Sequence, residues 1–265
     1  MSVALVTGGG RGVGRVMAEA LAAEGFAVCV VARTQSEVTE TADAIAANGG
    51  RAIALSADAT DREVVERVVT ETEERLGPID VLVNNAGRAH AIGPVWEVDP
   101  DDWWQDMEVN VRSAFLCARG VLPGMLERGG GRILNVSSYV ALRPTPYISA
   151  YAAAKAAILS LTEALAASVE DSGVRVFALT PGLFRSELMR HLMESEAGKR
   201  WLPGIGRGSR WVEPERVARL VVFLASGAGD RFHGRFLHAL DDLDELVARA
   251  DEIARDDLFT PRLRR

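Results

Sequence analysis

The chain has 265 residues, which is enough for one α/β domain with a sizeable core, and its net charge of −7 argues against nucleic acid as a main partner. The two cysteines, Cys29 and Cys117, lie in apolar segments and are expected to be buried thiols, which suits a reducing cytoplasm. The first residues already form a strand pattern and no uninterrupted apolar run approaches the roughly 20 residues that span a bilayer, so we expect a cytoplasmic protein without a membrane partner.

Strand patterns alternate with helix patterns along the whole chain. Strands are predicted near residues 3–6, 27–32, 52–56, 79–83, 132–137, 174–180 and 235–239, and helices near 12–24, 36–48, 61–76, 102–127, 149–171, 214–226 and 241–255. This alternation predicts a Rossmann-type, doubly wound parallel sheet of about seven strands flanked by helices. We expect a single domain over residues 1–240 that contains the catalytic centre, followed by a C-terminal helical extension over residues 241–265.

A glycine cluster follows the first strand and opens the first helix. In TGGGRGVG (7–14), Gly8, Gly12 and Gly14 are spaced G-x-x-x-G-x-G, and no GK[ST] follows, which argues against a P-loop ATPase. Glycines let the backbone approach an anion, and the helix N-terminus adds unpaired N–H groups and a positive dipole end. The segment therefore indicates a nucleotide phosphate site, with a plain tight turn as the alternative.

The end of the second strand bears on the choice between NAD and NADP. A carboxylate would be expected there if the ribose 2′-OH of NAD were bound. The sequence instead has Ala32 followed by Arg33, and Arg11 in the glycine segment could reach the same place. Because guanidinium groups pair well with phosphate oxygens, these residues favour NADP(H) over NAD(H), unless both arginines are simply solvated.

Two further strands end in residues suited to a ligand. The segment VLVNNAGRA (81–89) closes on the small and polar residues 84–87, which leave room for a flat ligand at the carboxyl edge of the sheet. The strand RILNVSS (132–138) ends at Ser138, thirteen residues before Tyr151, and the Ser138 hydroxyl could hydrogen-bond a substrate oxygen to which the Tyr151 phenol donates a proton.

Tyr151 and Lys155 are the most informative pair in the chain. They are four residues apart in a predicted helix and therefore share one face. A unit charge about 4 Å away at an effective dielectric constant of about 20 is worth up to roughly 4 kcal/mol, which can lower a pKa by about 3 units. We expect Lys155 to lower the pKa of Tyr151 from about 10 toward neutrality and so to make the phenol a general acid or base. Taken alone, the pair is more typical of a tyrosine on a helix with a surface lysine, and it is the glycine segment, residues 81–89 and Ser138 that favour the catalytic interpretation.

With these residues assembled, the chain resembles the short-chain dehydrogenase/reductase family. The matched motifs are TGGGRGVG (7–14), NNAG (84–87), Asn110 in MEVNVRSAF, the set of Ser138, Tyr151 and Lys155, and ALTPG (178–182). They occur in the family's order and spacing and cover about residues 2–235.

The resemblance implies a role for each matched position. Asn110, Ser138, Tyr151 and Lys155 would be catalytic: Tyr151 as acid or base, Lys155 as its cationic neighbour and ribose ligand, Ser138 as the group that orients the substrate oxygen, and Asn110 as the holder of a water. The implied cofactor contacts are Gly8, Arg11, Gly12, Val13, Gly14, Arg33, Asp58, Ala59, Asn85, Ala86, Gly87, Tyr151, Lys155, Pro181, Gly182, Phe184 and Ser186. Two of these residues also have plainer interpretations, Asn110 as an ordinary polar residue on a helix and Asp58 as a helix cap.

Residues 184–212 break the alternation and lie beside the expected nicotinamide loop. They could form a lid over the substrate, or a pair of surface helices whose aromatic residues fill the core or an interface. Together with residues 88–96 and 139–147 they are expected to form the pocket wall, and their apolar side chains suggest a mostly apolar substrate.

The C-terminal segment departs from the family pattern. Asp241, Asp242 and Asp244 are expected to cap an amphipathic helix, in preference to a metal site, and no metal is expected elsewhere. The departure weakens the expectation of the family's usual tetramer, so a homodimer through the helices near 102–127 and 149–171 is the alternative. The four histidines show no ligand-like spacing and are assigned no chemistry: His90, His191, His233 and His238.

The leading hypothesis is an NADP(H)-dependent oxidoreductase that moves hydride between the nicotinamide and a small-molecule ketone or secondary alcohol. The alternative from another class is a regulatory protein that binds NADP(H) without turnover. An unrelated glycine-loop enzyme such as a methyltransferase would explain the glycine segment but neither Ser138 nor the Tyr151–Lys155 helix.

Overall fold

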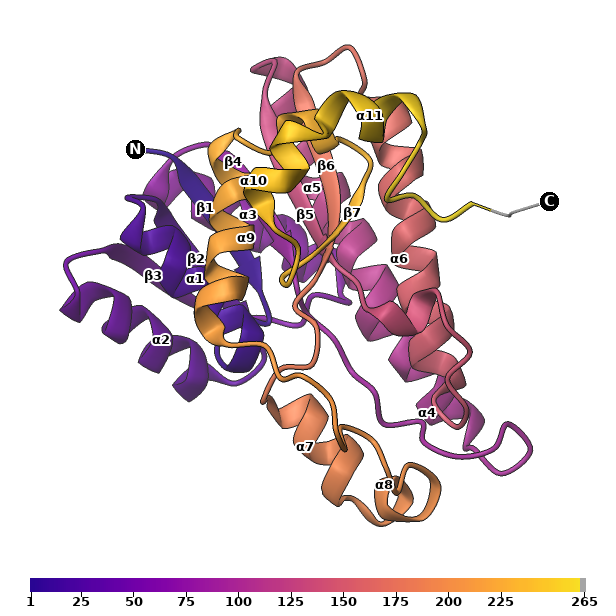
Figure 1. Ribbon diagram of the computed structural model, residues 1–265. Helices are drawn as coiled ribbons and strands as arrows, with labels where there is room; N and C mark the ends of the chain where they lie inside the picture. Colours follow the sequence, from indigo (N-terminus) through magenta and orange to yellow (C-terminus); the bar gives the residue numbers. More distant parts are fainter. Residues whose placement is uncertain (263–265) are drawn as a thin grey trace.

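The computed structural model describes residues 1–262 and contains one seven-stranded sheet (Figure 1). The strands are β1 (Val3–Thr7), β2 (Ala27–Ala32), β3 (Arg51–Ser56), β4 (Ile79–Asn84), β5 (Gly131–Val136), β6 (Val174–Thr180) and β7 (Phe236–His238). All neighbours pair in parallel in the order β3-β2-β1-β4-β5-β6-β7. The predicted doubly wound parallel sheet is therefore confirmed.

Helices cover both faces of the sheet, so the residues of the central strand β1 are buried on both sides. One face is covered by α1 (Gly12–Ala23), α2 (Gln35–Ala47), α9 (Pro214–Ser226), α10 (Leu243–Ala248) and α11 (Ala250–Arg255), and the other by α3 (Arg62–Leu76), α5 (Ser113–Glu127) and α6 (Ser149–Ser168). In β1, Ala4 and Val6 face the first group, and Val3 and Leu5 face the second.

The direction of winding reverses between β1 and β4. From β1 the chain proceeds outward to β2 and β3, and it then returns to β4 on the opposite side of β1. In open α/β sheets a crevice forms at this point, beyond the carboxyl ends of the strands. The loops after β1, β2, β4, β5 and β6 therefore converge where a ligand can bind.

The helix predicted over 102–127 differs from the observed structure. It begins earlier, as α4 (Pro100–Met107), because the Asp99 carboxylate caps it by accepting from the backbone N–H groups of Asp101 and Asp102. A π-helical turn over Glu108–Arg112 then separates α4 from α5. Such turns widen a helix locally and occur frequently at functional sites.

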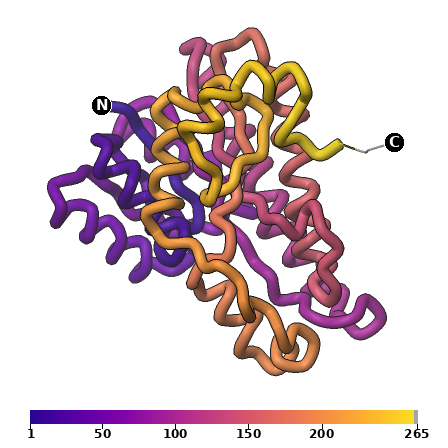
Figure 2. Tube along the Cα trace, in the orientation of Figure 1, coloured from indigo at the N-terminus to yellow at the C-terminus, as the bar shows by residue number. Residues whose placement is uncertain are grey.

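The C-terminal helix predicted over 241–255 is also corrected, because it is broken into α10 and α11 at Arg249. Leu246, Ala250 and Ile253 are buried in the main core, so this segment packs as part of the fold. The end of the described chain crosses toward α6 (Figure 2), where the Phe236 N–H of β7 donates to the carbonyl of Phe259 at 2.9 Å. The tail thus covers the outer edge of β7.

Of the described helices, α6 alone is long and apolar enough to cross a membrane by length and composition, with a mean hydropathy of 1.2. Lys155 and Glu163 interrupt it, and its Ile158 and Thr162 are buried against the sheet. The Thr162 hydroxyl accepts from the Asn135 side chain of β5 at 3.0 Å. These contacts are typical of a core helix.

Candidate active site

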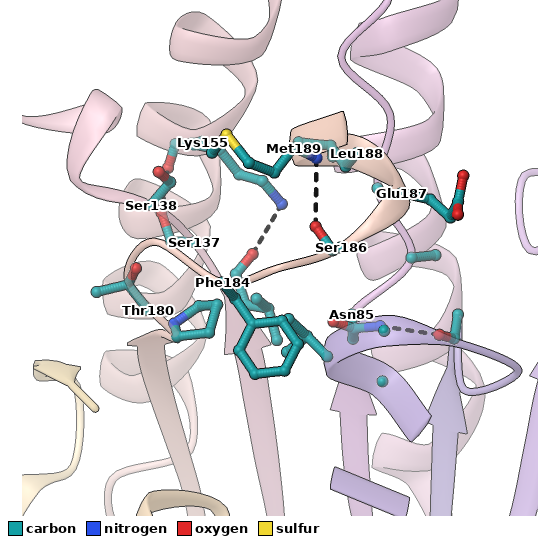
Figure 3. Close-up of a pocket in the computed structure, with 18 of the residues that line it drawn as sticks. Asn85, Ser137, Ser138, Lys155, Thr180, Phe184, Ser186, Glu187, Leu188 and Met189 are labelled. Carbon is teal, nitrogen blue, oxygen red and sulfur yellow. Dashed lines mark hydrogen bonds between the residues drawn. The ribbon is translucent and has the colours of Figure 1, made fainter. Parts of the chain in front are cut away.

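A cleft of about 770 Å³ lies at the carboxyl ends of the strands. Eighteen of the residues predicted to form the site line this cleft: Gly8, Arg11, Gly12, Val13, Gly14, Arg33, Asp58, Ala59, Asn85, Ala86, Gly87, Ser138, Tyr151, Lys155, Pro181, Gly182, Phe184 and Ser186. The remaining predicted residue, Asn110, is buried and is not among the residues that line the cleft. The close-up in Figure 3 shows Lys155 and Ser138 on one side of the cleft and Asn85 on the other.

The glycine turn forms a tight cradle after β1. Gly8 and Gly12 have φ angles of +62° and +54°, a region that favours glycine. A Cβ on Gly14 would lie 2.1 Å from the carbonyl oxygen of Gly8, so only glycine allows the helix to pack on the turn. Within residues 1–262 no side chain caps the N-terminus of α1, and its first N–H groups remain available to an anion. The cradle therefore fits a nucleotide phosphate.

Asn85 holds this cradle in place. Its side-chain amide donates to the carbonyl oxygens of Thr7 and Gly8, both at 3.1 Å. The Thr7 hydroxyl in turn accepts from the backbone N–H groups of Asn85 and Ala86. The sequence predicted space for a flat ligand here. The structure shows in addition that these hydrogen bonds connect the ends of β1 and β4.

The two arginines at the outer end of the cleft differ in their surroundings. The Arg33 side chain is exposed and makes no ion pair within residues 1–262. Arg11 forms an ion pair with Glu37 at 3.0 Å, and its side chain is 60% exposed. Arg33 is thus the guanidinium with its full charge available to a phosphate.

Asp58 is not the cap of the following helix. The cap of α3 is Asp61, whose Oδ1 accepts from the Val64 N–H at 3.1 Å. Asp58 instead accepts from the backbone and hydroxyl of Thr60 and lines the cleft. The interpretation of Asp58 as a helix cap is therefore wrong.

Ser138, Tyr151 and Lys155 meet where β5 ends and α6 begins. Tyr151 and Lys155 share a face of α6 as predicted, and the Lys155 Nζ lies 5.5 Å from the centroid of the Tyr151 ring. The Nζ donates to the carbonyl oxygen of Val136 at 2.9 Å, and the Ser137 hydroxyl donates to the Lys155 carbonyl at 2.8 Å. These bonds anchor the first turns of α6 to the end of β5.

The acidity of this pair differs from the sequence-based expectation. Burial raises the pKa of Tyr151 to about 12, although the interaction with the Ser138 hydroxyl lowers it in part. Burial also lowers the pKa of Lys155 to about 8. Loss of hydration acts against the charged form of both groups and is the largest cause of both pKa shifts. At neutral pH the phenol therefore keeps its proton and the ammonium is mostly charged.

Asn110 lies on the π-helical turn, and its amide orientation is fixed. Its Nδ2 donates to the carbonyl oxygens of Arg88 at 2.6 Å and Asp106 at 2.7 Å, and its Oδ1 is buried without a hydrogen-bond partner among the described residues. A Cβ placed on Gly87 would lie 3.1 Å from this Oδ1 and 3.7 Å from the Lys155 Nζ. Both polar atoms thus border one small space beside Gly87, so Asn110 is not an ordinary helix residue.

Arg88 and Asp106 support Asn110, and the sequence analysis missed them. The fully buried Asp106 carboxylate accepts from the Arg88 guanidinium at 2.5 Å and from the N–H groups of His90 and Ala91. Asp106 precedes Asn110 by one helical turn, and this spacing is the signal that could have found it. The pair holds the loop after β4 against the π-helical turn.

Residues 184–212 contain α7 (Glu187–Glu194) and α8 (Glu196–Trp201). In this segment Ser186 caps α7 through the N–H of Met189 at 3.3 Å (Figure 3). Leu192 and Trp201 pack in a small apolar cluster with Ile92 and Ile148 on the rest of the chain. The segment is thus a pair of short helices at the mouth of the cleft.

The acidic residues near the C-terminus have different roles. Asp242 caps α10 by accepting from the N–H groups of Asp244 and Glu245, as predicted. Asp241 instead accepts from the His238 N–H at 2.7 Å and lines the cleft. His238, which was assigned no chemistry, lines the cleft as well.

Comparison with known proteins agrees with this geometry. The family model for short chain dehydrogenases matches residues 2–197. A short chain dehydrogenase of Pseudocercospora fijiensis is 45% identical over 188 residues, which is 70% of this chain and 60% of that protein. The structure resembles a gluconate 5-dehydrogenase from Burkholderia cenocepacia J2315 in complex with NADP and tartrate, with a TM-score of 0.80 and 34% identity over 89% of this chain and 92% of that one. It also resembles a variant of actinorhodin polyketide ketoreductase with NADPH, with a TM-score of 0.81 and 31% identity over 89% of this chain and 95% of that one. The chain therefore belongs to the short-chain dehydrogenase/reductase family of oxidoreductases.

Proposed function

We propose that the protein reduces a ketone to a secondary alcohol with NADPH. The observation that carries the proposal is a single cleft that joins the open phosphate cradle at α1 to Ser138, Tyr151 and Lys155. A module that only binds a nucleotide needs the cradle but has no use for a phenol, a hydroxyl and an ammonium group at its inner end.

Four residues of the chain have separate roles at the substrate carbonyl. When bound, the nicotinamide supplies the hydride. The Ser138 hydroxyl orients the substrate oxygen, and Tyr151, which keeps its proton at neutral pH, donates that proton to the oxygen as negative charge develops. The Lys155 ammonium stabilises the resulting phenolate. The unpaired Asn110 Oδ1 would hold a water near Lys155, from which the proton is replaced.

The free Arg33 guanidinium supports a preference for NADPH over NADH, since it would meet the 2′-phosphate. The NADP and NADPH bound by the two similar structures agree with this preference. NADPH dependence favours reduction as the working direction.

The relatives support a carbonyl or alcohol substrate without naming one. One acts on gluconate and another on a polyketide, and both reactions fit a ketone and secondary alcohol pair. A homodimer or homotetramer and a cytoplasmic location stay predictions from the sequence.

The test is oxidation of NADPH followed by its absorbance in the presence of a panel of ketones that includes keto acids, sugars and polyketide-like aromatics. We expect ketone-dependent oxidation with at least one class. Tight NADPH binding without oxidation across the whole panel would contradict the proposal and favour the regulatory alternative.

A further inference from the structure

His238 is a buried polar group that the proposed reaction does not use. It ends β7 beside Thr180 of β6, is only 9% exposed, and lines the cleft. The Cε1 and Nε2 atoms of its ring face Gly182, since a Cβ placed on that residue would lie 2.9 and 3.0 Å from them. The ring therefore forms part of the wall next to the loop expected at the nicotinamide.

The tautomer of His238 follows from its hydrogen bonds. Its Nδ1 accepts from the backbone N–H of Leu240 at 2.8 Å, and a backbone N–H can only donate. In the neutral ring the proton must therefore be on Nε2. Burial lowers the pKa of His238 and so keeps the ring neutral at pH 7. Nε2–H has no hydrogen-bond partner within the described chain and is a donor fixed in the cleft wall.

Two more polar side chains extend this wall. The Tyr139 ring lies 4.9 Å from the His238 ring, and the Arg143 guanidinium carbon lies 5.6 Å from the centroid of Tyr139. Both residues line the cleft, and Arg143 makes no ion pair within residues 1–262. Asp241 is the carboxylate nearby, and it is already engaged by the His238 N–H. This part of the cleft wall thus presents the imidazole N–H of His238, the phenol of Tyr139 and the guanidinium of Arg143. All three groups can donate hydrogen bonds to a ligand.

The substrate end of the cleft also has an apolar wall, with Thr145, Glu187 and Arg210 among the polar residues that line the cleft. Its lining includes Ile148, Leu188, Met189, Leu192 and Ile205, which come from the start of α6 and from the segment with α7 and α8. A ligand that fits both walls has an apolar face on one side and hydrogen-bond acceptors on the other.

We propose that His238 and Tyr139 form a donor subsite that binds a second oxygen group of the substrate, a carboxylate or a hydroxyl, in addition to the carbonyl that is reduced. The substrate is then an oxygenated ketone, in contrast to the mostly apolar ligand expected from the sequence. This inference rests on the proposed function. The carboxamide oxygen of the nicotinamide is the competing acceptor for the His238 Nε2–H, because both would approach Gly182.

The test compares cyclohexanone with its hydroxy and carboxy derivatives for the wild type, His238→Phe and Tyr139→Phe. His238→Phe keeps an aromatic ring against Tyr139 and removes the donor, and Tyr139→Phe removes only a hydroxyl from a side chain that is 43% exposed. We expect each variant to lose about tenfold in kcat/KM for a derivative that the wild type prefers and to change little with cyclohexanone, since one hydrogen bond is worth about that factor. The affinity for NADPH, measured by fluorescence titration, should be unchanged.

Three results would overturn the inference. An equal loss with all three ketones would show a general defect instead of a subsite, and a weakened affinity for NADPH alone would assign the donor to the cofactor. Both results leave the proposed function intact, because cyclohexanone would still be reduced. Absence of NADPH oxidation by the wild type with these three ketones and with the whole panel of ketones named above would reject the proposed function, and this inference with it.

Discussion

The buried ammonium of Lys155 should make the protein less stable than it would be with an apolar residue at that position. Burial lowers its pKa from 10.5 to about 8, and at about 1.4 kcal/mol per pKa unit this shift corresponds to about 3 kcal/mol of unfavourable free energy at pH 7. Lys155→Met removes that cost but also removes the hydrogen bond to the Val136 carbonyl, worth about 1 kcal/mol. We therefore expect a net stabilisation of about 2 kcal/mol, or an increase in Tm of about 4 to 8 °C, together with loss of reductase activity.

The pH dependence identifies the cause of this stabilisation. Below pH 8 the lysine is charged in both the folded and unfolded states, so the cost is fully present. Between pH 8 and 10.5 the folded protein releases the proton that the unfolded chain still binds, and the wild type gains stability relative to the variant as the pH rises.

The assay is urea denaturation of both proteins at pH 7 and at pH 10.5. The chain contains only one other lysine, Lys199, which is 61% exposed and provides the control variant Lys199→Met, for which we expect almost no change. A stability difference between wild type and Lys155→Met that is the same at both pH values would refute the reasoning, as would a less stable Lys155→Met at pH 7.

Three further predictions concern other parts of the cleft. Arg33→Asp should raise the KM for NADPH at least tenfold and leave the KM for NADH nearly unchanged, because it replaces the guanidinium expected at the 2′-phosphate; equal effects on both cofactors would contradict this role. Asp106→Asn should destabilise the protein by about 3 kcal/mol in urea denaturation and lower kcat more than the affinity for NADPH, since it removes the buried partner of the Arg88 charge and loosens the support of Asn110. Asp102→Asn, which changes the half-exposed partner of the same arginine, should have a much smaller effect. If residues 184–212 close over the cleft, NADPH should slow limited proteolysis within them, and identical cleavage with and without NADPH would reject a lid.

The features that could be predicted from the sequence are those fixed by local patterns. The alternation of buried strands and amphipathic helices predicted the order of elements, and the glycines of the first turn predicted the cradle. The spacing of Tyr151 and Lys155 predicted their shared face. Each of these depends on residues within one element or one turn.

The features that the sequence did not reveal depend on contacts between distant segments. The break of the last helix at Arg249 and the π-helical turn at Asn110 depend on the packing of their surroundings. The expected acidity of Tyr151 was wrong for the protein without cofactor because the sequence pattern does not show how far both groups are removed from water. His238 lies about 90 residues from Tyr151 in the chain, and only the pairing of β7 with β6 brings it to the cleft.

The most direct test of the central claim is the activity of Tyr151→Phe, which removes a single hydroxyl and keeps the ring. Tyr147→Phe is the matched control, because Tyr147 packs on Trp201 and is not among the described residues that line the cleft. With a ketone that the wild type reduces, we predict that Tyr151→Phe loses at least about a hundredfold in kcat, the usual contribution of a general acid, while it still binds NADPH and Tyr147→Phe stays active. Full activity of Tyr151→Phe would contradict the account.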